Sequence, residues 1–236
     1  MLSDEFGWTA DFKMNLFFTL SEFVYITELV GVAVFAITGA LAAQGKHMDI
    51  LGVVVLAIVT SLGGGTIRDL TLDIHPLLWI QNDTYIWTAV ISAIGAFWVC
   101  RYLRYPRRLL IILDALGMAL FTVLGAQKAI SLELPAIIVV MMAMVTGCAG
   151  GMVRDVLTRQ IPLILHRHGE LYATCSIIGA VLYVWLDGSM HPVVLVALSI
   201  SIIFIIRMAA VFGDICLPEF IVAGHKLERR DDKERG

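Results

Sequence analysis

The chain has 236 residues, of which 59% are hydrophobic and 16% are charged, whereas soluble domains carry about 25% charged residues. Its mean hydropathy of +0.86 leaves too little polar surface to cover a globule in water. This excludes a soluble enzyme, a disordered protein and a basic nucleic-acid-binding protein, and the formal charge of −3 offers no attraction to nucleic acid. We therefore expect an all-α integral membrane protein in a lipid bilayer, with no enzymatic activity and no soluble partner.

A helix that crosses a bilayer needs about 20 mainly apolar residues. The sequence predicts seven such transmembrane helices, at residues 22–44, 49–74, 84–101, 109–130, 134–158, 170–187 and 191–212. The segment 1–21 carries Asp4, Glu5 and Asp11 where a signal peptide would be positive, so we expect it to be an N-terminal segment outside the membrane. The tail 213–236 ends in a charged run and is expected to lie in the cytoplasm.

Lysine and arginine set the predicted orientation, because they concentrate in cytoplasmic loops. With the N-terminus outside and seven spans, thirteen of these residues fall inside and three fall outside, namely Lys13, Arg68 and Lys128; Arg207 lies within the last span. We expect a multi-pass protein of the inner (plasma) membrane with an outer N-terminus and a cytoplasmic C-terminus.

The sequence repeats itself at an offset of 86 residues. Glycine, proline and charged positions match without a gap; for example, Gly64, Arg68 and Pro76 correspond to Gly150, Arg154 and Pro162. Each copy holds three spans, at 22–104 and 105–190, so the second copy enters the membrane from the opposite side. The sequence thus predicts an inverted 3+3 repeat followed by one C-terminal helix at 191–212.

Glycines interrupt the second and fifth spans at equivalent positions. From Asp49 to Leu62 a helix rises only about 21 Å, so the glycines that follow lie within the bilayer. Such runs weaken a helix by roughly 1 kcal/mol per residue, and they indicate either an unwound, pore-lining kink or close helix packing. The residues concerned are Gly63, Gly64, Gly65, Gly147, Gly150 and Gly151.

Charges follow both glycine runs as Arg68–Asp69 and Arg154–Asp155. Intramembrane charges are costly and are functional candidates, although a structural ion pair is the alternative. By depth, Arg68 should pair with Glu28 of the first span, and Arg154 with Asp114 of the fourth. Asp69 and Asp155 are then the adjacent acidic residues.

Lys128 breaks the symmetry of the repeat, because Ala42 stands at its equivalent position. It continues the helical stripe of Asp114 and Gly117, which faces the predicted interface between the repeats. The sequence leaves two interpretations open: a pore-facing positive gate, or a lysine that extends to the outer surface.

The remaining reactive residues carry little signal. The four cysteines, Cys100, Cys148, Cys175 and Cys216, lie in or beside apolar runs with no CxxC pair, as buried structural cysteines do. His166 and His168 have no carboxylate or thiolate partner nearby, so we expect neither a metal site nor a cofactor.

The segments 60–69 and 146–155, together with Gly125-Ala-Gln-Lys-Ala129, resemble the prokaryotic trimeric intracellular cation (TRIC) channel family, whose repeats are also described as a glycine-transporter-like domain. The resemblance implies a homotrimer with a potassium-permeable, monovalent cation pore in each protomer. It also implies that the second and fifth helices line that pore with kinks at their glycines, and that Lys128 takes part in gating. The sequence departs from the family pattern at Ala149, where a glycine is expected.

Three functions stay open from sequence. Carbonyls freed at the kinks would suit a cation channel, whereas the N-terminal dipole of a half-helix would suit a carrier for a small zwitterion such as glycine. A non-transporting scaffold is the third, and the paired intramembrane charges argue against it.

Overall fold

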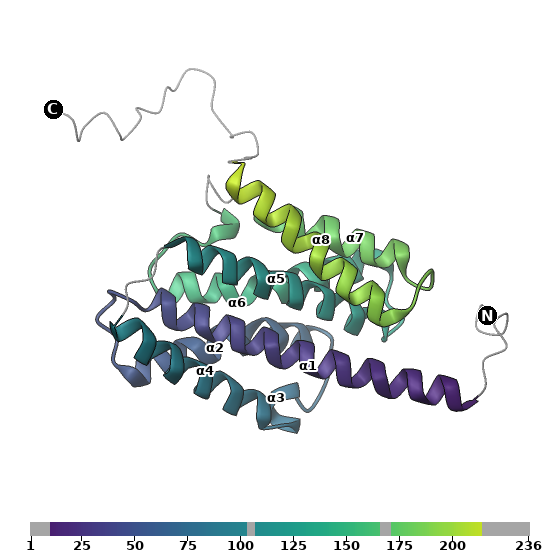
Figure 1. The fold of residues 1–236 in the computed structure, drawn as a ribbon, viewed down its shortest axis with the longest axis horizontal. Coiled ribbons are helices and arrows are strands. Elements are labelled where there is room, and N and C mark those ends of the chain that lie inside the picture. The colour runs from purple at the N-terminus through teal and green to yellow at the C-terminus, as the bar shows by residue number, and fades with distance from the viewer. Residues whose placement is uncertain (1–9, 103–106, 166–170, 214–236) are drawn as a thin grey trace, which may run out of the picture.

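A computed structural model describes residues 10–102, 107–165 and 171–213, and these residues form helices and turns without a strand. Figure 1 shows the helices in chain order. They are α1 (Ala10–Ala42), α2 (Ile50–Thr71), α3 (Leu78–Gln81), α4 (Thr84–Tyr102), α5 (Arg107–Ile130), α6 (Ala136–Leu157), α7 (Tyr172–Leu186) and α8 (Pro192–Phe212), with a 3-10 turn at Leu163–Leu165. The all-α membrane fold predicted from sequence is confirmed.

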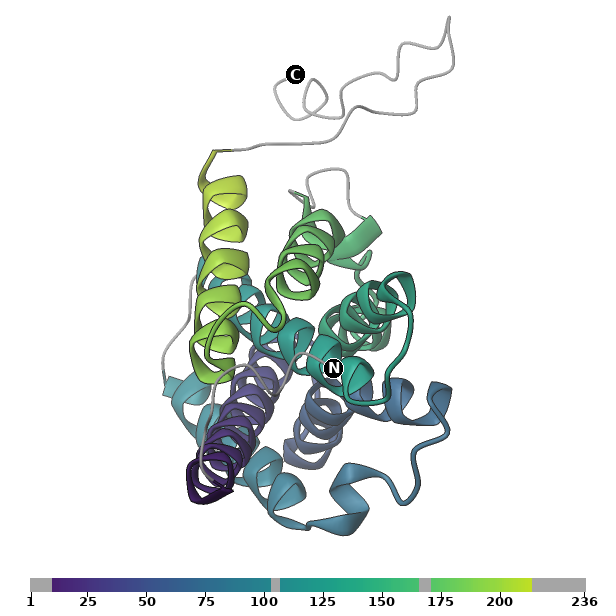
Figure 2. The ribbon, with the colours of Figure 1, turned by 90° about the vertical axis from the view of Figure 1, so that its right-hand side faces the viewer.

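Two groups of three long helices form the bundle. Helices α1, α2 and α4 pack together, as do α5, α6 and α7, and the groups meet where α1 contacts α5 and α2 contacts α6. Helix α8 lies against α5 and α7, at the edge of the second group (Figures 1 and 2). The interface between the groups is therefore built from the first two helices of each.

A helix occupies each predicted span, and six of them are long and apolar enough to cross a membrane. The exception is α7, whose 15 residues rise only about 22 Å against a hydrocarbon core of about 30 Å. Helix α1 begins at Ala10 rather than at residue 22. Residues 10–21 contain no glycine or proline to stop the helix, so it extends past the apolar segment Leu20–Ala42.

Reciprocal contacts relate the two groups by a pseudo-two-fold axis. A Cβ at Gly31 would press on the Phe121 ring, and a Cβ at Gly117 would press on the Phe35 ring. The two rings stack between the groups with their centroids 5.3 Å apart. Each contact joins a residue of one repeat to a residue of the other, and adding or subtracting 86 converts one contact into its mate. Only a two-fold relation produces such an exchange.

The backbones of α2 and α6 approach each other closely where these helices cross. A Cβ at Gly64 would collide with the Thr146 carbonyl oxygen, and a Cβ at Gly150 would collide with the Thr60 carbonyl oxygen. Both obstacles are backbone atoms, which cannot rotate away. Glycine at these two positions is thus what lets the helices touch backbone to backbone.

Both helices run through their glycines without interruption, as α2 over Ile50–Thr71 and α6 over Ala136–Leu157. No unwound turn therefore forms there, and a pore-lining kink of the still regular helices at these glycines stays a prediction. Contacts across the bundle hold each helix in its regular form, which offsets the weak helix propensity of the glycines. The alternative from sequence, close packing through small residues, describes Gly64 and Gly150.

Substituting Gly64 or Gly150 by alanine should lower the thermal stability of the purified protein, because the added Cβ meets a backbone carbonyl. We expect a cost of about 1–3 kcal/mol, as for overpacked cores. The matched control is Gly63→Ala in the same helix, since a Cβ there meets nothing within 4 Å. Melting in detergent measures all three; equal effects at Gly63 and Gly64 would contradict the packing role.

Candidate functional site

Arg68 and Asp69 form a buried ion pair near the end of α2. Arg68 Nε donates to Asp69 Oδ1 at 2.8 Å, and Arg68 Nη2 lies 2.7 Å from the same oxygen. The two side chains are only 4% and 3% exposed. The guanidinium bends back along its own helix, so its charge is offset by its immediate neighbour in sequence.

A small cavity of about 20 Å³, room for about one water molecule, adjoins this pair. Helices α1, α2, α3, α4 and α5 contribute to its wall. Its lining combines two carboxyl groups, one guanidinium, three hydroxyls and apolar or aromatic side chains: Glu28, Val32, Ser61, Leu62, Gly65, Thr66, Arg68, Asp69, Leu78, Trp79, Tyr85 and Phe121. Oxygen ligands of this kind are what hard cations prefer.

Glu28 of α1 holds a carboxyl group in this cavity. The Tyr85 hydroxyl of α4 donates to Glu28 Oε2 at 2.5 Å, which fixes the carboxyl group against α4. Elsewhere in the wall, Trp79 Nε1 donates to Thr66 Oγ1 at 3.1 Å and joins α3 to α2. The cavity therefore has a wall tied together by hydrogen bonds between elements.

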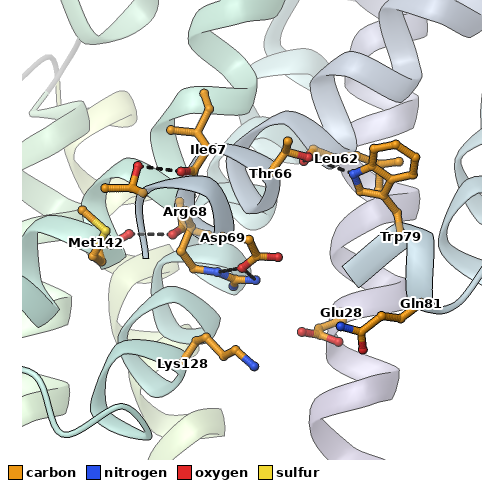
Figure 3. A network of polar contacts seen from close by, with 12 residues as sticks. Glu28, Leu62, Thr66, Ile67, Arg68, Asp69, Trp79, Gln81, Lys128 and Met142 are labelled. Atoms are coloured by element: carbon orange, nitrogen blue, oxygen red, sulfur yellow. Dashed lines mark hydrogen bonds and ion pairs between the residues drawn. The ribbon is translucent and has the colours of Figure 1, made fainter. Parts of the chain in front are cut away.

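Lys128 of α5 extends toward this cluster (Figure 3). Its side chain is exposed at the surface of the protomer, and it is near enough to interact electrostatically with Glu28, as are Arg68 and Asp69. Lys128 thus lies at the surface and beside the charged cluster, and its role as a gate stays a prediction.

The second repeat forms a tighter network around Arg154 on α6. Arg154 Nη1 lies 2.6 Å from Asp114 Oδ1 of α5, and Arg154 Nε donates to Asp155 Oδ1 at 2.9 Å. The Arg154 side chain is completely buried. Asp155 also accepts a hydrogen bond from the Leu163 backbone N–H at 3.1 Å, which ties the following loop to the network. Arg154 and Asp114 are thus paired as expected from their depth.

The equivalent pair expected between Glu28 and Arg68 does not form, and the Tyr85 hydroxyl takes the place of the guanidinium at Glu28. In the second repeat the Tyr172 hydroxyl lies beside Asp114, next to Gly151, but Asp114 keeps its contact with Arg154. Each arginine pairs with the aspartate that follows it in the sequence. Side chains at i and i+1 do not normally face each other on a helix, and for that reason Asp69 and Asp155 were not predicted as the partners.

The six glycines that the sequence predicts to line a pore lie in different surroundings. Gly65 lines the cavity, whereas Gly64 and Gly150 lie at the crossing of α2 and α6. Gly147 fits against Thr122 and the Met118 carbonyl of α5, and Gly151 lies beside Asp114 and the Tyr172 hydroxyl. Gly63 has open space around its Cβ position. One of the six therefore contributes to the cavity, and four fit against neighbouring groups of the bundle.

A further contact near the Arg154 network was not predicted. The Arg207 guanidinium of α8 lies 5.0 Å from the centroid of the Tyr172 ring, and both residues are buried. A cation–π contact of this geometry is favourable when it is shielded from water. Tyr85 and Tyr172 lie near the starts of α4 and α7, the third helices of the two repeats. Comparing the expected membrane depths of these helix starts with those of Glu28 and Asp114 would have identified both tyrosines.

Two copies of one family model, described as "Glycine transporter", match residues 25–101 and 111–188. The matches begin 86 residues apart and together cover more than half of the chain. The chain belongs to the TRIC family. Its relatives include the UPF0126 inner membrane protein YadS of Escherichia coli strain K12, which is 39% identical over 200 residues, or 84% of this chain and 96% of the relative. A UPF0126 membrane protein of Vibrio cholerae is 38% identical over 85% of this chain and 84% of the relative.

Solved TRIC structures share the fold. The trimeric intracellular cation channel orthologue from Rhodobacter sphaeroides superposes with a TM-score of 0.76 at 34% identity, over 80% of this chain and 98% of that chain. Another TRIC cation channel gives a TM-score of 0.75 at 35% identity, over 85% and 98% of the two chains. Nearly the whole of each TRIC structure therefore has a counterpart here.

Double-mutant cycles, measured as thermal stability in detergent, should distinguish the Arg68 site from the Arg154 network. Removing either member of the Asp114–Arg154 pair, as Asp114→Asn or Arg154→Gln, should cost about 3–5 kcal/mol because a buried charge loses its partner. The two changes should couple strongly, whereas Glu28→Gln and Arg68→Gln, which form no ion pair, should couple much more weakly. Strong coupling at Glu28 and Arg68, or additivity at Asp114 and Arg154, would contradict the pairing described.

Proposed function

We propose that this protein is a potassium-permeable channel for monovalent cations, with a pathway through each protomer that passes the Glu28–Asp69 cavity. The observation that carries the proposal is a cavity with two carboxyl groups at membrane depth in a chain related to TRIC cation channels. Carboxyl groups and the Ser61 and Thr66 hydroxyl oxygens can replace part of a cation's hydration shell.

This proposal assigns cation binding to side chains, because the unbroken α2 and α6 helices offer no freed carbonyls. The same observation weakens the carrier for a zwitterion, which depended on the N-terminal dipole of a half-helix. A carrier keeps some support from the mixed charges of Arg68 and Glu28 and from the description of the family model. The channel is better supported, since the related structures are described as cation channels.

The assembly we propose is a homotrimer in the inner membrane, with the N-terminus outside and the C-terminus in the cytoplasm. The trimer is supported by the description of the Rhodobacter sphaeroides relative as a trimeric channel, and the membrane by the description of the Escherichia coli relative. The distribution of lysine and arginine supports the orientation.

Reconstitution into planar bilayers in potassium chloride tests the transport mode. We expect unitary current steps, because a continuous pathway conducts many ions per opening. Saturable uptake of labelled glycine into proteoliposomes, with no unitary steps, would overturn the channel in favour of the carrier.

Lys128→Ala should raise the unitary conductance or the open probability, because an ammonium group in a narrow pathway of low dielectric constant repels cations. Lys128→Arg should keep the wild-type behaviour, since it keeps the charge. Lys46→Ala, in the turn between α1 and α2, is the control and should change neither quantity. Wild-type currents in Lys128→Ala would show that the lysine does not limit conduction.

A further inference from the structure

A second hollow lies on the outer surface of the bundle, where α1, α4 and α5 meet. Its volume is about 380 Å³, within the range of small-molecule sites. Ile37 and Leu41 of α1, Gly95 and Val99 of α4, and Leu109 of α5 line it. A Cβ at Gly95 would meet nothing within 4 Å, so this glycine leaves the floor of the groove open. We refer to this hollow as the α4 groove.

The α4 groove lies on the apolar outer face of the bundle, which is suited to contact with lipid. Among the six candidate spans, α4 has the smallest buried share, 17% of its apolar window. Large apolar side chains are exposed along it, including Ile94, Trp98 and Val99. A hollow in such a face is surrounded by lipid tails rather than by water.

Basic residues stand at one end of the groove. Arg101 follows directly after Cys100, which lines the groove, and Arg108 precedes Leu109 on α5. Both arginine side chains are exposed. The Arg101 guanidinium lies 5.8 Å from the centroid of the Trp98 ring, so it is held over an aromatic side chain of the type that prefers the membrane interface. The opposite end, at Ser92, carries no charge.

The length of the groove matches one leaflet. From Ser92 to Cys100 a helix rises about 12 Å, close to half of the about 30 Å hydrocarbon core. A ligand that fits has an apolar chain of one leaflet's depth and a negative head at the arginines. That is the form of an anionic phospholipid, and basic pockets between transmembrane helices bind such headgroups.

We propose that the α4 groove binds one acyl chain of an anionic phospholipid, whose phosphate contacts Arg101 and Arg108. The site lies on the lipid-facing surface, away from the Glu28–Asp69 cavity, and does not depend on the proposed transport function. It would give the protein a preference among membrane lipids.

Native mass spectrometry of the full chain in detergent, titrated with phosphatidylglycerol or phosphatidylcholine of equal chain length, counts bound lipids and protomers together. We expect wild type to retain phosphatidylglycerol in preference. The double variant Arg101→Gln and Arg108→Gln should lower its apparent affinity roughly 25-fold, about fivefold for each arginine. Arg159→Gln, an exposed arginine after α6, is the control and should leave the affinity unchanged.

A second variant tests the apolar half of the site. Gly95→Leu should fill the groove and reduce the binding of both lipids, while the protomer count stays that of wild type. Unchanged phosphatidylglycerol preference in the double arginine variant, or equal retention of the two lipids by wild type, would overturn the proposal. It would also be overturned if Gly95→Leu kept the bound lipid but dissociated the oligomer, because the groove would then be covered by a second copy of the chain.

Discussion

The backbone contact between α2 and α6 at Gly64 and Gly150 is the constraint on which the rest of the bundle depends. Because the crossing is two-fold related, each helix carries its arginine four residues, or about 6 Å, beyond the contact. Arg68 and Arg154 are thereby directed to different sets of neighbours. A larger residue at the crossing would push the two repeats apart. It would also separate the Phe35 and Phe121 rings, which stack beside the crossing.

The two-fold frame places equivalent charges in unequal surroundings. Around Arg154, two carboxylates enclose the guanidinium and exclude water, and α8 adds Arg207 over the Tyr172 ring. Around Arg68 the neighbouring aspartate is the partner, and Tyr85 draws Glu28 away toward α4. One end is therefore a closed structural network, and the other keeps a cavity beside it.

Much of this could be read from the sequence, because it depends on spacing. The 86-residue repeat and the series of apolar segments predicted the helices and the membrane fold, and the opposite directions of the helices predicted that Arg154 meets Asp114.

The features that could not be predicted also have physical reasons. Apolar composition did not mark the start of α1, since a helix continues into polar residues when nothing breaks it. Glycine runs signalled weakness, but packing against α6 kept α2 regular through them. The partner of Glu28 depended on a tyrosine hydroxyl, which counting charges does not consider.

The proposed cation pathway has to tolerate two positive side chains, and they differ in kind. Arg68 is buried, and Asp69, which contacts it through two nitrogens, offsets part of its charge beside the cavity. Lys128 is exposed on a flexible stem and extends toward Glu28, which Tyr85 holds in place. An ammonium group and a potassium ion are both attracted to a carboxyl group, so in the proposed pathway Lys128 would compete with the cation for Glu28. A voltage, a bound ligand or a shift of α5 that moves this one side chain would then be enough to change the access of cations to Glu28.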